Sequence, residues 1–203
     1  MTAAIDFYFA CPSPWSYLAT ERLHDIAQRH GREVAYKPID VGRAWSTTGG
    51  GRPMGERPQV ALDYRLVELP RWRAFRDVPL NTEPKFFPVD HWPSSRVIVA
   101  ARLTGADVHA LTVGFMRACW AEERDIADPA TIEAIAQAAG FDGAALLAAS
   151  GEAAVTDAIA TDTDQAMAAG AWSVPSMVVD GELFFGQDRL ELIEWRLGGG
   201  RNA

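Results

Sequence analysis

The stretch that decides the fold is residues 5–39, IDFYFACPSPWSYLATERLHDIAQRHGREVAYKPI. Apolar and more polar residues alternate over 5–9, which predicts a strand. Apolar residues then recur every three or four positions over 15–27, as on one face of a helix. Residues 33–39 form a second short strand pattern. A strand–helix–strand unit in about forty residues predicts two parallel strands with a right-handed crossover.

The ends of this first helix carry their own signals. Ser13 occupies the N-cap position, and Pro14 follows at the first helical position, where a missing N–H costs nothing. Gly31 is a natural C-terminal stop. The helix is therefore expected to begin directly after the first strand.

The middle of the chain has a different character. Residues 47–58 (TTGGGRPMGERP) are rich in glycine and proline and predict a loop. From there to about residue 168 the pattern is mostly helical, apart from a connector rich in proline and aromatic residues over 79–93. The expected helices are 59–76, with Pro70 as a candidate bend, 93–103, 107–123, 129–138, 144–149 and 152–168.

Strand patterns return at the end of the chain. Residues 176–179 (SMVV) and 182–185 (ELFF) flank Asp180-Gly181, a strong two-residue hairpin signal. A closing helix is expected over 189–197. The predicted fold class is α/β, a thioredoxin-like βαβ…ββα domain of residues 1–46 and 169–203, interrupted by a large all-helical insertion of residues 47–168. The four strands form one sheet only if the insertion leaves and returns at neighbouring points.

Composition narrows the function. The 203 residues carry a net charge of −8, which disfavours nucleic acid as a partner, and 48% are hydrophobic, as in globular proteins. No apolar run reaches the ~20 residues of a membrane helix, and no secretory signal is visible. The two cysteines, Cys11 and Cys119, make no disulfide framework, and the four histidines show no metal-binding spacing. We therefore expect a cytoplasmic protein without a metal site.

The first candidate site is Ser13-Pro14-Trp15-Ser16, where the first strand meets the helix. A helix N-terminus favours an anion, but two hydroxyls cannot form a disulfide, which disfavours dithiol exchange. His24 and His30 lie ~16 Å and ~25 Å along the same helix and cannot act as a base for Ser13. We expect the Ser13 hydroxyl to donate a hydrogen bond to the thiolate of a bound thiol. On spacing alone, a plain N-cap is the commoner role.

Two further candidates lie near the C-terminus. A cis Val174–Pro175 bond would turn the Val174 backbone outward as a short ladder for an extended peptide, although a trans bond is far commoner. Asp188 is expected to cap a helix, with Arg189 in its first turn; this carboxylate and the helix N–H groups could recognise an α-amino acid head group. A plain cap with a solvent-facing arginine is the alternative.

These stretches together resemble a known family. DFYFACPSPWSYLA (residues 6–19), SVPSMVVDGELFFGQDRLEL (residues 173–192) and the helical block between them are similar to 2-hydroxychromene-2-carboxylate isomerases. Those enzymes are relatives of kappa-class glutathione transferases and of DsbA-type oxidoreductases. The resemblance covers essentially the whole chain, and the combination of its two motifs is specific.

The resemblance implies glutathione as the cofactor. Ser13 matches the family's catalytic serine, which is held against the glutathione sulfur. Val174 and Pro175 match the cis-proline pair that ladders with the glutathione cysteine, and Asp188 and Arg189 match the pair that binds its γ-glutamyl end. The chain departs from the family in two places: glycines occupy 49–51, in a loop where relatives are expected to carry an asparagine, and Asp90 stands where relatives often carry asparagine. Arg57 and Lys85 are candidates to bind carboxylate groups.

The implied reaction interconverts 2-hydroxychromene-2-carboxylate and trans-o-hydroxybenzylidenepyruvate, a step in the breakdown of aromatic compounds. It proceeds by reversible thiolate addition, bond rotation and elimination. An aromatic pocket is expected near Trp15, Phe86, Phe87 and Trp92, and a homodimer is implied by resemblance. The alternatives are a kappa-type glutathione transferase or peroxidase, and a non-catalytic thioredoxin-like binding module.

Overall fold

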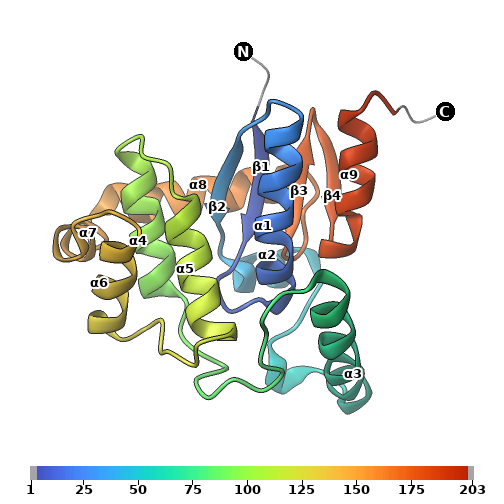
Figure 1. The fold of residues 1–203 in the computed structure, drawn as a ribbon, viewed down its shortest axis with the longest axis horizontal. Helices are drawn as coiled ribbons and strands as arrows, with labels where there is room; N and C mark the ends of the chain where they lie inside the picture. Colours follow the sequence, from blue (N-terminus) through green and yellow to red (C-terminus); the bar gives the residue numbers. More distant parts are fainter. Residues whose placement is uncertain (1–3, 201–203) are drawn as a thin grey trace.

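The structure of the protein, a computed structural model, describes residues 4–200. Four strands and a series of helices follow one another along this part of the chain (Figure 1). The elements are β1 (Ile5–Phe9), α1 (Pro14–Arg29), β2 (Val34–Pro38), α2 (Val41–Thr48), the 3₁₀ turn η1 (Met54–Glu56), α3 (Gln59–Arg76), α4 (Trp92–Leu103), α5 (His109–Trp120), α6 (Pro129–Ala138), α7 (Gly143–Ala149), α8 (Ala153–Ala168), β3 (Ser176–Val179), β4 (Glu182–Phe185), η2 (Gln187–Arg189) and α9 (Leu190–Leu197).

The four strands form one sheet in the order β2-β1-β3-β4. β1 and β2 run parallel, with Phe7 opposite Tyr36, whereas β3 runs antiparallel to β1 and to β4. The crossover α1 supplies the long connection that parallel pairing requires. The expected βαβ…ββα sheet is therefore confirmed. The helical block leaves after β2 and returns at β3, and these two strands lie on either side of β1.

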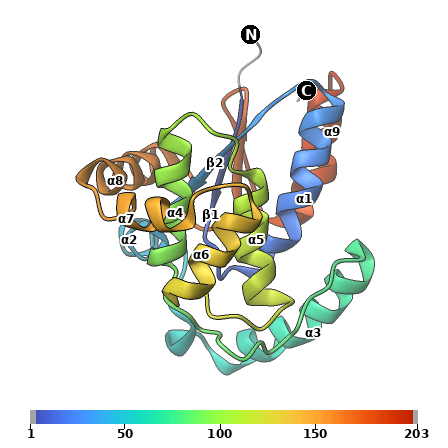
Figure 2. The ribbon, with the colours of Figure 1, turned by 60° about the vertical axis from the view of Figure 1, so that its left-hand side comes forward.

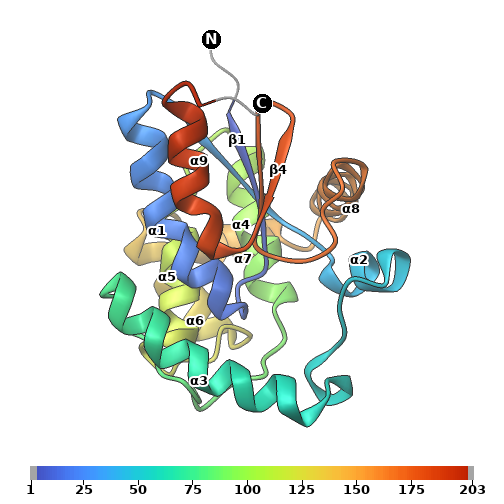
Figure 3. The ribbon, with the colours of Figure 1, turned by 90° about the vertical axis from the view of Figure 1, so that its right-hand side faces the viewer.

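Side-chain alternation along β1 divides the core between the two faces of the sheet. Phe7 and Phe9 pack in the larger apolar cluster with α1, α4 and α5, whereas Tyr8 packs in a smaller cluster with Ile39 and Val174. Both faces are thus covered. Figure 3 shows α1 and α9 on one face of the sheet and α8 on the other. Burial on both faces explains why Tyr8, expected on a more polar face, is only 2% exposed.

One helix was missed by the sequence prediction. Residues 41–48 form α2, so the predicted loop begins only at Gly49. The signals were present: the carboxylate of Asp40 accepts a hydrogen bond from the backbone N–H of Arg43 at 2.9 Å, and Gly49 ends the helix with φ of 71°. A helix of two turns with an internal glycine gives too short a pattern to stand out.

The remaining helices lie close to their predicted positions. α5 is shorter than expected and ends at Trp120, because its C-cap Ala121 leaves the helical conformation with φ of −122°. α3 contains Pro70 and bends along its length, as Figures 2 and 3 show. Within the described residues, no helix is both long and apolar enough to cross a membrane.

Candidate active site

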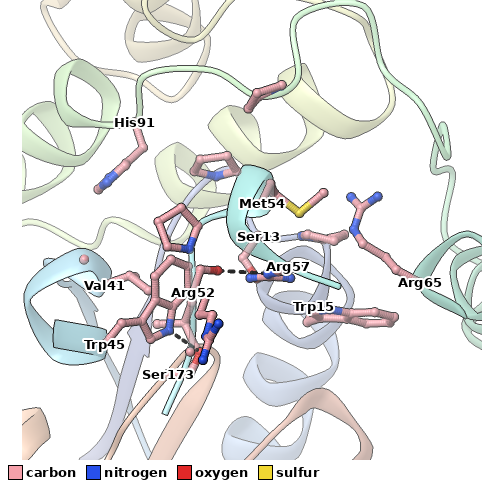
Figure 4. A pocket seen from close by; sticks show the side chains of 18 of the residues that line it. Ser13, Trp15, Val41, Trp45, Arg52, Met54, Arg57, Arg65, His91 and Ser173 are labelled. Atoms are coloured by element: carbon pink, nitrogen blue, oxygen red, sulfur yellow. Dashed lines mark hydrogen bonds between the residues drawn. The ribbon is translucent and has the colours of Figure 1, made fainter. Parts of the chain in front are cut away.

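A cavity of about 620 Å³ opens beside the N-terminus of α1 (Figure 4). Segments far apart in the sequence contribute to its wall: the start of α1, α2, the loop after α2, α3, the connector before α4, and the residues before β3. The lining residues are Ala10, Pro12, Ser13, Pro14, Trp15, Val41, Gly42, Trp45, Gly50, Gly51, Arg52, Pro53, Met54, Arg57, Pro58, Arg65, Phe87, Pro88, Val89, His91, Trp172, Ser173, Val174 and Phe185.

Ser13 lies in this wall as the N-cap of α1. Its Oγ accepts a hydrogen bond from the backbone N–H of Ser16 at 3.1 Å. Because the hydroxyl uses a lone pair in the cap, its proton remains available to a second group. The expected helix cap is confirmed, and donation to a bound thiolate stays a prediction.

Backbone groups around Ser13 add further donors and acceptors. The N–H of Trp15, and both the N–H and the C=O of Val174, have no hydrogen-bond partner among residues 4–200. All three belong to residues that line the cavity. A peptide-like ligand could therefore pair with Val174 while an anion sits at the helix N-terminus.

The Val174–Pro175 bond is cis. Val174 lines the cavity, whereas Pro175 is buried behind it. The Pro175 carbonyl accepts a hydrogen bond from the N–H of Gly186 at 2.9 Å. This bond brings the segment after β4 next to the segment before β3.

Asp188 and Arg189 lie two and three residues beyond Gly186, outside the cavity lining. The expected helix cap at Asp188 is wrong: Asp188 lies inside η2, α9 begins at Leu190, and no side chain caps either element. The Asp188 carboxylate instead pairs with the Arg189 guanidinium at 3.4 Å, and both residues are exposed. The three residues of η2 occupy the place of the expected cap, and α9 begins one residue later than expected.

The cysteines are unsuited to thiol chemistry in this cavity. Cys11 and Cys119 are both free and buried, and neither lines the cavity. Burial raises the pKa of each thiol to about 12, so neither is a thiolate near neutral pH. Any thiolate at Ser13 must therefore come from outside the chain.

The charged residues of the cavity wall are all cationic. Arg52, Arg57 and Arg65 line it, and no lining residue is acidic. Burial lowers the pKa of Arg57 and of Arg65 from the ordinary arginine value, yet a guanidinium stays charged near neutral pH. Lys85, the other candidate for binding carboxylates, lies over the Phe86 ring outside the wall.

The aromatic lining differs in part from the expected one. Trp15 and Phe87 line the cavity, whereas Phe86 and Trp92 do not. Instead, the wall contains three aromatic residues that sequence reasoning missed, Trp45, Trp172 and Phe185. They come from α2, from the chain before β3 and from the end of β4, so only the folded sheet brings them together.

The packing of two tryptophans explains why glycines occupy positions 50 and 51, one of the departures from the family pattern. A Cβ at Gly51 would overlap the Trp45 indole, and a Cβ at Gly50 would overlap Trp172. The Trp45 indole N–H in turn donates a hydrogen bond to the Oγ of Ser173 at 3.1 Å. Glycines are thus required here so that two tryptophans can pack against the loop backbone.

His91 is a further cavity residue whose place in the wall could not be predicted from the sequence around it. Its Nδ1 lies 3.2 Å from the Oγ of Ser95, and burial lowers its pKa. The imidazole is therefore neutral at physiological pH. No group of three or more His, Cys, Asp or Glu residues suited to a metal occurs within residues 4–200.

Comparisons with known proteins agree with this geometry. A family model described as a DSBA-like thioredoxin domain matches residues 4–198. A 2-hydroxychromene-2-carboxylate isomerase of Sphingobium xenophagum is 32% identical over 96% of this chain and 97% of its own length. The chain belongs to the 2-hydroxychromene-2-carboxylate isomerase family. A solved structure of a 2-hydroxychromene-2-carboxylate isomerase superposes with a TM-score of 0.81 at 26% identity, covering 97% of this chain and 95% of that one.

Two more distant proteins are also similar to this chain. Glutathione S-transferase kappa 1 of Caenorhabditis elegans is 34% identical over 40% of this chain and 36% of its own length. The cytosolic disulfide reductase DsbM of Pseudomonas aeruginosa, solved with GSH, shares the fold with a TM-score of 0.64 at 19% identity, over 96% of this chain and 99% of that one.

Proposed function

We propose that this protein is a glutathione-dependent isomerase that interconverts 2-hydroxychromene-2-carboxylate and trans-o-hydroxybenzylidenepyruvate. The observation that carries the proposal is Ser13, a helix-capping serine with a free hydroxyl proton in a cavity whose charged groups are all cationic. Full-length relatives at about 32% identity that are named for this reaction support it. The substrate is an aromatic acid, which suits a wall of aromatic side chains and arginines.

The residues present fit glutathione. Its thiolate would lie against the Ser13 hydroxyl and the Trp15 N–H, two donors at the positive end of α1. Its cysteine backbone would pair with the N–H and C=O of Val174, as a strand pairs with a sheet edge. The bond from Gly186 to the Pro175 carbonyl brings Asp188 and Arg189 toward that end, where they would hold the γ-glutamyl group.

The chain's own residues then have four tasks. When bound, glutathione supplies a thiolate that adds to the conjugated double bond of the substrate and leaves unchanged after the resulting single bond has rotated. Ser13 stabilises the thiolate, which makes it a weaker base and a better leaving group. Trp15 and Phe87 contact the aromatic ring, and the arginines hold carboxylates. The ring of the substrate opens by cleavage of its C–O bond, and the neutral imidazole of His91 can exchange a proton with that oxygen.

A spectroscopic assay of ring opening and isomerisation tests the proposal. With catalytic glutathione, we expect substrate turnover many times the amount of thiol, and with none we expect at most a small residual rate. Free thiol at the end should equal the thiol added. Stoichiometric loss of thiol would instead identify a transferase of the kappa type, the activity named for the nematode relative. Glutathione binding without turnover would identify a binding module.

Two further properties belong to this proposal. We place the enzyme in the cytoplasm, where glutathione is abundant and cysteines such as the two free ones here stay reduced. It acts as a homodimer. Along α3, Val60, Tyr64, Val67 and Phe75 are 74%, 59%, 46% and 72% exposed, and their spacing puts them on one side of the helix. An exposed apolar stripe of this kind is suited to a second copy of the chain.

A further inference from the structure

Arg65 is the most unusual charged residue of the cavity. It is only 9% exposed, although arginine is rarely so buried without an anionic partner. Its Nη2 is fully buried and has no hydrogen-bond partner within residues 4–200. The charge of Glu83 acts on Arg65, but among those residues no carboxylate lies within ion-pair distance of it. Burying a charged group in this state is unfavourable unless another anion completes it.

The guanidinium is also held in a defined orientation. Its centre lies 5.0 Å from the ring centre of Phe87 and 5.5 Å from that of Trp120. Stacking against aromatic rings uses the faces of the guanidinium and leaves its N–H edges for hydrogen bonds. Such edges match the two oxygens of a carboxylate.

The surroundings select an aromatic ligand. Arg65 lines the same cavity as Ser13 and Trp15 (Figure 4). The Phe87 ring beside its guanidinium also lines that cavity. Arg57 differs from Arg65, since its Nε already donates to the Arg52 carbonyl at 2.9 Å and its guanidinium lies over Trp45. The charge of Arg57 also acts on Arg65, so the two arginines are neighbours that have different contacts.

We propose that Arg65 is the anchor for the substrate carboxylate, and that the cavity binds planar aromatic acids through it even when no thiol is present. The inference rests on the proposed function for the identity of the acid, but not for its binding. Arg57, nearer the loop after α2, then remains for the glycyl carboxylate of glutathione.

Calorimetric titration with trans-cinnamate in the absence of glutathione tests this directly. Cinnamate has the aromatic ring, the conjugated double bond and the carboxylate, but no keto group to react. We expect the wild-type protein to bind it and to bind the neutral cinnamamide at least tenfold more weakly. Arg65→Gln should weaken cinnamate binding at least tenfold and remove the preference for the acid over the amide. Arg57→Gln, the matched control in the same cavity, should weaken it less than threefold.

The outcomes separate this inference from the proposed function. Equal affinities for acid and amide in the wild type, or a larger loss in Arg57→Gln than in Arg65→Gln, would overturn the role of Arg65, whatever the isomerase assay shows. If cinnamate binds through Arg65 but the protein has no isomerase activity, the role of Arg65 is supported and the proposed reaction is refuted. If Arg65→Gln does not fold, Arg65→Lys replaces it, because lysine keeps the charge but lacks the paired N–H donors of the guanidinium. It should bind cinnamate more weakly than the wild type while still preferring it to the amide.

Discussion

The Oγ of Ser13 lies 3.1 Å from the backbone nitrogen of Ser16 and accepts its hydrogen bond. This contact fixes the hydroxyl at the N-terminus of α1 and leaves its proton for a ligand. Ser13 therefore caps α1 and also lines a cavity of about 620 Å³. The capping and the proposed catalytic role depend on different atoms of one group, so substitution should separate them.

Ser13→Ala should lower the isomerase rate about 100-fold or more, the size of effect seen when a donor to a developing anion is removed. The loss of the cap should lower the free energy of unfolding by only about 1 kcal/mol. Steady-state kinetics and urea denaturation measure the two effects.

The matched control is Asp142→Ala. The Asp142 carboxylate caps α7 by accepting a hydrogen bond from the N–H of Ala145 at 3.0 Å. This variant should lose similar stability and keep its full rate. Equal rates in Ser13→Ala and the wild type would remove Ser13 from the mechanism.

Asp188→Asn should raise the KM for glutathione about five- to tenfold, because it removes one charged partner of the γ-glutamyl ammonium group at an exposed site. The kcat at saturating glutathione should change little, since Asp188 lies outside the cavity wall. Glutathione titrations of the rate measure both constants. Asp164→Asn, in another surface ion pair with Arg43, is the control and should leave KM unchanged. An unchanged KM in Asp188→Asn would exclude this residue from glutathione binding.

A histidine cluster far from the proposed chemistry should make stability depend on pH. The His24 and His109 rings stack with centres 3.6 Å apart, and the Tyr36 hydroxyl lies 2.6 Å from Nδ1 of His109. Burial, followed by the charge of His24, lowers the pKa of His109, although Glu21 and Asp107 raise it in part.

Protonation of His109 therefore favours the unfolded chain, in which its pKa is near 6.5. Its contribution to stability is complete above about pH 6.5 and is lost as the pH falls below that value. Thermal unfolding should show a falling Tm between about pH 7 and pH 5. His109→Gln, which can still hydrogen-bond to Tyr36, should show a smaller fall. An equal or steeper fall in the variant would contradict this account.

Val67→Glu should convert the proposed dimer into monomers, because it places a charge on the exposed apolar side of α3. Sedimentation equilibrium measures the mass. Leu103→Glu is the control, since Leu103 is 52% exposed on α4, away from that stripe. A wild-type protein that is already monomeric, or a Val67→Glu variant that stays dimeric, would refute the α3 interface.

The sequence predicted best what local patterns determine. Asp180-Gly181 fixed the hairpin, because both residues adopt the positive φ that its turn needs, 50° and 86°. The bounds of β3 and β4 were therefore predicted correctly. Ser13-Pro14 fixed the start of α1 in the same way. The division of the chain at residues 46 and 169 stays a prediction.

Long-range packing accounts for most of what was missed. Arg65 reads as one more charged residue on a helix, and only its burial against Phe87 and Trp120 reveals an unpaired guanidinium. Trp45 enters the cavity wall through α2, a helix too short to detect. At Asp188 the error was local, because Asp188 lies inside η2 and α9 begins one residue later than expected.

The most direct test of the central claim is the pKa of the glutathione thiol when bound to the protein. Thiolate absorbance in the ultraviolet, measured against protein without glutathione as the pH rises, gives this value. The buried cysteines, with pKa values of about 12, do not interfere near neutral pH. We predict a pKa well below that of free glutathione in the wild type and a return toward the free value in Ser13→Ala. Bound glutathione that titrates like the free thiol, or identically in both proteins, would contradict the account.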